Sequence, residues 1–197
     1  MKKIFALLLI ACMAFSFAAC GKGDGEEQTV TDVSAFNTAI AATNPTGAVL
    51  NVKTTTAIGD LNAKYTVAYN ADGTAVITYE IEKFNEFDPA NPDADVKSTV
   101  NGTVNLAADG SYTGDAISGN VADIAAGVSV DLTAVADKAT VNEAGDILTV
   151  VVPAASTESV IGTAVASDVT LVVTISGGTV EQINITYAGT EIVCKYN

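Results

Sequence analysis

The C-terminal part of the chain decides the fold, and residues 171–197 read LVVTISGGTVEQINITYAGTEIVCKYN. Apolar side chains occupy every second position in three runs, separated by Gly177-Gly178 and Ala188-Gly189. The three runs are Leu171, Val173, Ile175; then Ile183, Ile185, Tyr187; then Ile192, Cys194, Tyr196. Because a period of two buries one face of a strand, this pattern predicts three consecutive antiparallel strands. Cys194 shares the apolar parity, so we expect a buried small hydrophobe rather than a reactive thiol.

The same period of two sets in from Gly47 and appears clearly in the first half of the chain. Alternating residues in 65–69 and 75–81 flank the turn-forming sequence 70–73, Asn-Ala-Asp-Gly, and this predicts a hairpin. A third strand is expected over 96–106 after a long loop. Its parity is unbroken across Asn101-Gly102, so we interpret it as one strand with glycine on the inner face, although that dipeptide is also a strong turn signal.

The remaining predicted elements are shorter. Strands are expected near 111–113 and 139–141 and over 147–152, and brief helices are expected from Asp131 and after Ser156. Residues 114–138 are otherwise alanine-rich and mixed in period, and they give no clear prediction.

The domain is expected to open with an amphipathic helix. Val33, Phe36 and Ile40 recur at spacings of three and four, and Thr31 or Asp32 could cap the helix. The predicted fold class is therefore α+β: a curved, mostly antiparallel sheet of about eight to ten strands, with the N-terminal helix and one or two short helices covering one face. This element order resembles the LolA, LolB and LppX lipoprotein-carrier group. The resemblance implies that a lipid or acyl chain is held between sheet and helices, and it assigns no site residue.

The N-terminus has the pattern of an export signal. Lys2 and Lys3 precede the apolar run 4–17, and the small residues Ala18-Ala19 stand before Cys20. The apolar run is shorter than the roughly 20 residues that a permanent spanning helix needs. We therefore predict that residues 1–19 are removed.

The residues around the cleavage point resemble the bacterial lipobox. They are Phe17-Ala18-Ala19-Cys20-Gly21, with Phe17 where that family usually has leucine. The resemblance implies a diacylglycerol on the Cys20 thiol and often an acyl group on the new amino terminus, and two or three chains make a stable anchor. The alternative is an ordinary secretory signal with a coincidental cysteine.

The predicted anchor divides the chain and gives its location. Residues 1–19 are the leader, 20–28 are the lipidated cysteine with a flexible acidic tether, and 29–197 form a single domain. The expected location is the extracytoplasmic side of the cell membrane or outer membrane. With Cys12 removed in the leader and Cys20 acylated, Cys194 has no partner for an internal disulfide.

The composition excludes several classes of function. The chain has a net charge of −14, with nine lysines, no arginine and no histidine, and loss of Lys2 and Lys3 leaves −16. A surface of this sign does not attract nucleic acid. Without histidine, neither a Ser-His-Asp nor a Cys-His constellation can form, and the commonest ligand of zinc is missing. We therefore expect no enzymatic activity and no cofactor beyond the covalent lipid.

Two groups of carboxylates are the remaining candidates for chemistry. Glu80 and Glu82 would lie about 6.6 Å apart on one strand face, near the spacing of inverting glycosidases, but they oppose the apolar parity and are expected on a solvated face. In the loop 84–95, Asp88, Asp93 and Asp95 are candidate calcium ligands, without the spacing or closing glutamate of an EF-hand. The alternative is a polar loop kept soluble by its charge.

Two functions fit these observations. The first is a membrane-anchored, non-enzymatic binding module, a carrier or chaperone for an apolar or lipid ligand. The alternative is a structural or surface-interaction lipoprotein of the cell envelope, whose partner is an envelope protein and which has no small ligand.

Overall fold

The computed structural model describes residues 33–85, 96–115, 121–128 and 130–197. The predicted leader, Cys20, the tether and the calcium candidates Asp88, Asp93 and Asp95 lie outside the described residues. Among the described residues, ten strands form one antiparallel sheet: β1 (Gly47–Thr56), β2 (Gly59–Tyr69), β3 (Ala75–Phe84), β4 (Lys97–Leu106), β5 (Tyr112–Gly114), β6 (Thr140–Val141), β7 (Ile147–Val152), β8 (Val169–Ser176), β9 (Thr179–Tyr187) and β10 (Thr190–Tyr196).

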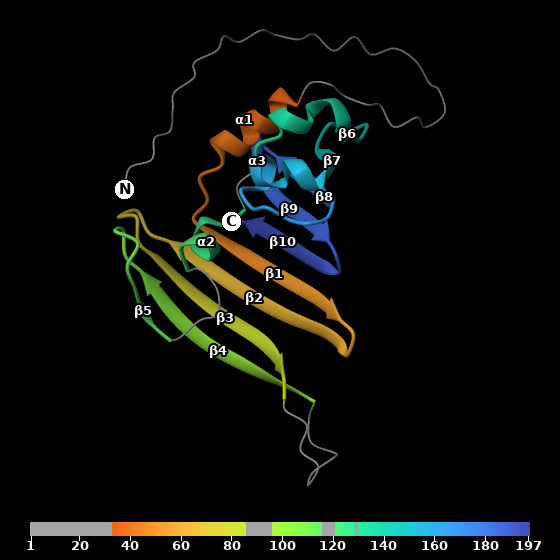
Figure 1. Cartoon of the computed structure of the whole chain (residues 1–197). Helices are drawn as coiled ribbons and strands as arrows, with labels where there is room; N and C mark the ends of the chain where they lie inside the picture. The colour runs from red at the N-terminus through yellow and green to blue at the C-terminus, as the bar shows by residue number, and fades with distance from the viewer. Residues whose placement is uncertain (1–32, 86–95, 116–120, 129) are drawn as a thin grey trace.

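The strand order is β5-β4-β3-β2-β1-β10-β9-β8-β7-β6, so the sheet is made of two five-stranded meanders. They join at the centre, where the first and last strands pair from Ala48↔Tyr196 to Thr54↔Thr190 (Figure 1). Backbone hydrogen bonds extend this seam, since the Thr46 amide donates to the Asn197 carbonyl. The two ends of the domain are therefore fixed to each other in the middle of the sheet.

Short helices cover parts of one face of the sheet. The α-helices are α1 (Ser34–Ala42), α2 (Val121–Ala126) and α3 (Thr157–Ile161), and two 3₁₀ turns are η1 (Thr133–Lys138) and η2 (Ala154–Ser156). Helix α1 packs on β8 and β9, whereas α2 packs on β4 (Figure 1). No helix among the described residues is long and apolar enough to cross a membrane.

The apolar side chains of the inner face form two clusters. One joins α1, η1 and α3 to β7, β8 and β9 and is centred on fully buried residues such as Leu132 and Leu171. The other lies under α2 and includes Ile77, Val104 and Cys194. Val128 and Tyr196 contact both clusters, so the helix α2 region and the C-terminal strand lie at their boundary.

The structure confirms most of the predicted strands. The three C-terminal strands, the hairpin of β2 and β3 and the strand over 147–152 are all present. The strand predicted over 96–106 is the single strand β4, which begins one residue later, at Lys97. Cys194 is fully buried, as its parity predicted.

Two predictions are corrected. The N-terminal helix begins at Ser34, and the residue at its cap is Val33, which makes no side-chain capping bond; Thr31 and Asp32 lie outside the described residues. The element after Asp131 is a 3₁₀ turn rather than an α-helix, and the Asp131 carboxylate accepts the Thr133 amide at 2.9 Å. Helix α2 lies within the stretch that gave no clear prediction.

Gly102 is on the inner face of β4, as predicted, and its lack of a side chain is required there. It pairs directly with Tyr79 on β3, and the buried ring of Tyr79 occupies the space where a Cβ at position 102 would stand. Aromatic side chains commonly cover a strand glycine in this way. Gly102 therefore leaves the space that the Tyr79 ring fills.

Replacing Gly102 by alanine is expected to lower the free energy of unfolding by about 1–3 kcal/mol, the usual cost of overpacking. The measurement is urea denaturation of the variant beside Asn101→Ala, which changes the adjacent exposed position. Equal midpoints for the two variants would contradict this packing role.

Candidate functional site

A cleft of about 630 Å³ lies between the helices and the inner face of the sheet. Its apolar surface comes from Ile40 of α1, Ala125 of α2 and the strand residues Ala75, Leu106 and Ile183. Ala75 and Ile183 are buried in different core clusters, so the cleft lies where the two clusters meet. The cleft is a hollow where the two halves of the sheet meet, and the short helices leave this hollow open.

Two tyrosines fix the α2 side of the cleft to the sheet. The Tyr69 hydroxyl donates to the Ala125 carbonyl at 2.8 Å. The Tyr196 hydroxyl donates to the Val128 carbonyl at 2.8 Å and accepts the Val128 amide at 3.3 Å. Burial raises the pKa of both phenols, so both remain neutral donors at physiological pH. Their hydroxyls are already hydrogen-bonded, and they offer mainly ring surface to the cleft.

The opposite side of the cleft is fixed by Thr43, at the end of α1. Its hydroxyl donates to the Ala39 carbonyl at 2.7 Å and accepts the Val180 amide of β9 at 2.9 Å. The Thr43 side chain therefore caps the C-terminal end of α1 and joins this end to β9. With both sides held by hydrogen bonds, the cleft is largely pre-formed, as small-molecule sites usually are.

Cys194 lies close to this boundary but has the properties of a core residue. Burial raises the pKa of its thiol, which also contacts Tyr196 and the Val128 backbone. A thiol in such an environment stays protonated and unreactive.

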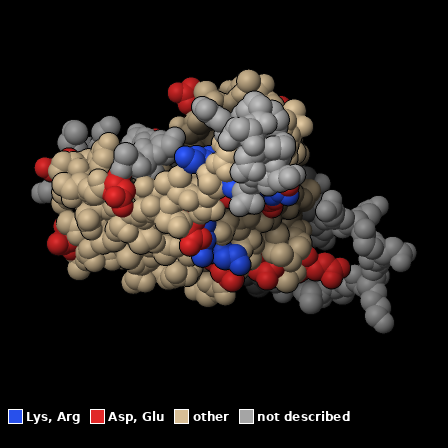
Figure 2. Space-filling model, turned by 90° about the horizontal axis from the view of Figure 1, so that it is seen from below, with Lys and Arg blue, Asp and Glu red and all other residues tan. Residues whose placement is uncertain are grey.

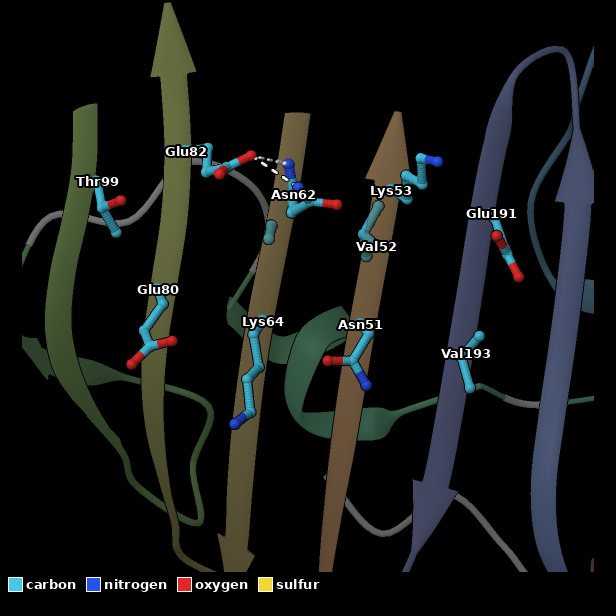
Figure 3. A pocket seen from close by; sticks show the side chains of 11 residues that line it. Asn51, Val52, Lys53, Asn62, Lys64, Glu80, Glu82, Thr99, Glu191 and Val193 are labelled. Atoms are coloured by element: carbon cyan, nitrogen blue, oxygen red, sulfur yellow. Dashed lines mark hydrogen bonds between the residues drawn. The ribbon is translucent and has the colours of Figure 1, made fainter. Parts of the chain in front are cut away.

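A second, polar groove of about 340 Å³ crosses the outer face of the sheet (Figure 3). Glu80 and Glu82 both line it, so the prediction that they share the solvated face is confirmed. The Glu82 carboxylate accepts the backbone amide and the side-chain amide of Asn62, both at 2.8 Å, and lies 3.6 Å from the Lys97 ammonium.

This arrangement does not suit paired-carboxylate catalysis. The Asn62 backbone and side-chain bonds, with Lys97, lower the pKa of Glu82, whereas a general acid needs a raised one. Glu80 is exposed and stands opposite Lys64 in the strand register. On the face seen in Figure 2, lysines and acidic side chains are interspersed, and no extended basic patch is seen.

The described part of the chain holds no group of three or more His, Cys, Asp or Glu side chains placed to bind a metal. The predicted calcium ligands Asp88, Asp93 and Asp95 lie outside that part, and calcium binding by their loop stays a prediction.

Comparison with known proteins gives little beyond a loose likeness of shape. No family model and no curated protein matches the sequence. Among solved structures, the chain is similar to the crystal structure of LprF from Mycobacterium bovis, with a TM-score of 0.40 and 10% identity over 83% of this chain and 90% of that chain. We therefore base the function on the chain's own residues.

Proposed function

We propose that this protein is a lipid-anchored, extracytoplasmic binding module that holds an apolar ligand in the cleft between α1, α2 and the sheet. The observation that carries the proposal is the cleft itself. Its volume of about 630 Å³ is within the roughly 300–1,000 Å³ of small-molecule sites. The anchor on Cys20 follows from the lipobox-like sequence and would hold the open cleft beside a membrane.

The energetics favour an apolar ligand. Covering apolar surface contributes roughly 25 cal/mol per Å², and Ile40, Leu106 and Val128 are only partly buried around the cleft. A chain of methylene groups in contact with these side chains would remove them from water together with its own surface. Because the tyrosine and threonine bonds already fix the two sides, little ordering entropy opposes binding.

The test is to fill the cleft. Ala75 is buried at the start of β3 and lines the cleft, so Ala75→Leu should remove space for a ligand and lower affinity for the neutral apolar probe N-phenyl-1-naphthylamine at least tenfold. The matched control is Ala68→Leu, an exposed position on β2. The fluorescence of the probe is titrated against three proteins: the two variants and the chain with neither substitution, called wild-type here. All three carry Cys20→Ala, so that no anchor lipid competes with the probe for the cleft.

A saturable signal in the wild-type chain and Ala68→Leu, but not in Ala75→Leu, is the expected result. Equal affinities in all three proteins would overturn the placement of the ligand. A folded wild-type chain that never binds the probe would overturn the proposed function.

One observation favours the alternative, a surface-interaction lipoprotein without a small ligand. Ile58 in the β1–β2 turn and Val96 before β4 are each 74% exposed. Exposed apolar residues of this kind can contact a protein partner. Cross-linking from position 58 to one envelope protein, together with an absence of probe binding, would support this alternative.

A further inference from the structure

We infer that the cleft selects ligands with an uncharged polar head and rejects the anionic form of a fatty acid. This inference rests on the proposed function and names the chemical class of its ligand. An acyl chain linked to a hydroxyl, ester or amide head would bind, whereas a free carboxylate would not.

The first observation is the lining. Seventeen described residues line the cleft, and none of them is charged. The polar side chains at its rim are neutral: Thr43, Asn44, Asn70 and Thr74. A carboxylate placed there would lose hydration without gaining an ion pair.

The second observation is where the lysines lie. Of the six lysines among the described residues, Lys53, Lys64, Lys97 and Lys195 have the outward parity of the sheet, opposite the cleft. Lys83, of inward parity near the far end of β3, and Lys138 of η1 do not line the cleft. Lys53 forms an ion pair with Asp60 at 2.9 Å, and Lys97 lies near Glu82. The internal segments outside the described residues, 86–95 and 116–120, contain no lysine or arginine in their sequence. No described lysine therefore lines the cleft, and the sheet separates four of the six from it.

The third observation is that the charged side chain beside the cleft, Asp72, is negative. Asp72 belongs to the β2–β3 turn, between Asn70 and the cleft residues Gly73 and Thr74. Its carboxylate accepts the Thr74 hydroxyl at 2.7 Å and the Thr74 amide at 3.0 Å, and these bonds lower its pKa. Asp72 is therefore an anion at neutral pH, and it repels a second carboxylate.

A second acidic turn is adjacent to the first. A Cβ placed at Gly73 would lie 3.6 Å from the Ala108 Cβ, so the turn before β5 touches the β2–β3 turn. Asp109 in that turn accepts the Ser111 hydroxyl and amide, and these bonds lower the pKa of its carboxyl as well. Two fixed negative charges thus stand on one side of a neutral cleft.

The rim can still recognise a neutral head. Asn70 donates to the Thr74 hydroxyl at 2.9 Å, which leaves its amide oxygen as an acceptor. The exposed Asn44 side chain offers both a donor and an acceptor. Amide groups of this kind match hydroxyl and ester groups without any requirement for charge.

The experiment compares ligands that share one chain and differ in the head. 1-Lauroylglycerol, 1-dodecanol and laurate compete with N-phenyl-1-naphthylamine for the chain carrying Cys20→Ala. At pH 8, the two neutral ligands are expected to displace the probe at concentrations at least tenfold below that of laurate. Between pH 8 and pH 5, displacement by laurate should strengthen as its carboxyl takes up a proton, while displacement by dodecanol should stay constant.

A charge placed at the rim supplies the complementary test. Asn44→Lys should strengthen laurate binding at pH 8 by about threefold to tenfold, the effect of a partly exposed ion pair, and leave dodecanol unchanged. Thr99→Lys adds the same charge at an exposed position in the outer groove of the sheet, seven residues along β4 from Leu106, and should change neither ligand. Equal binding of laurate and dodecanol at pH 8 would overturn the inference and leave the proposed function intact. Failure of every ligand to displace a bound probe would count against the apolar-ligand function instead.

Discussion

Replacing Cys20 by alanine is expected to release the protein from the membrane. In cells grown with an alkyne-tagged fatty acid, the wild-type chain should carry the label and sediment with membranes, whereas Cys20→Ala should carry none. The physical reason is that each buried methylene contributes about 0.8 kcal/mol, so two or three acyl chains hold the protein firmly and their loss leaves only the domain. With a net charge of −14, the chain has no electrostatic attraction to an anionic membrane that could replace the anchor.

The control for this prediction is the other cysteine that remains after export. Cys194 is buried in β10, so Cys194→Ala should keep both the label and the membrane fraction. Label retained on Cys20→Ala would show that the lipobox interpretation is wrong. If Cys194→Ala also lost its label, the loss would indicate a defect in export rather than in acylation.

Truncating Leu171 is expected to reduce stability strongly. Its side chain is fully buried in β8 and stands opposite Val150 and Ile185 on the neighbouring strands. Leu171→Ala should lower the free energy of unfolding by about 2–5 kcal/mol, because the apolar contacts are lost and a cavity remains. A domain of this size is stabilised by only about 5–15 kcal/mol in total, so this loss is a large fraction of its stability.

The matched control lies on the adjacent strand. Val151 is 52% exposed on the outward face of β7, and Val151→Ala should change stability by no more than about 0.5 kcal/mol. Both variants are measured by urea denaturation of the chain carrying Cys20→Ala. A small effect at position 171 would contradict the burial of the inner face.

Leu171 also shows why much of the sheet could be predicted. Strict alternation between glycine-containing turns fixes both the strands and their inner face, and this held for β8, β9, β10 and the β2–β3 hairpin. The inner-face position of Gly102 in β4 is predictable for the same reason, since the apolar residues before and after it share one parity. Period-two signals are local, and turns between consecutive strands set their register.

The pairing of β1 with β10 could not be predicted in this way. It joins residues about 140 positions apart in sequence, such as Leu50 and Cys194, and no local pattern encodes that partnership. Near its start, β1 reads Ala48-Val49-Leu50, with apolar residues on both faces, and this obscures the alternation.

The cleft could not be predicted from the sequence either, because it depends on the pairing of β1 with β10. Tyr69 and Tyr196 could be assigned to the inner face from their parity, but their bonds to Ala125 and Val128 require the long connection through α2. That connection has no clear period in sequence. A resemblance in element order suggested a hollow between sheet and helices, and only the tertiary structure identifies its residues.

The central claim is that the cleft between α1, α2 and the sheet receives an apolar chain. The most direct measurement is a crystal of the chain carrying Cys20→Ala soaked with 12-bromododecanol, with diffraction collected at the bromine absorption edge. We predict an anomalous bromine peak inside the cleft, close to Ala75, Leu106 or Ile183. Bromine peaks confined to the outer face, or a cleft that holds only water at saturating ligand, would contradict the account.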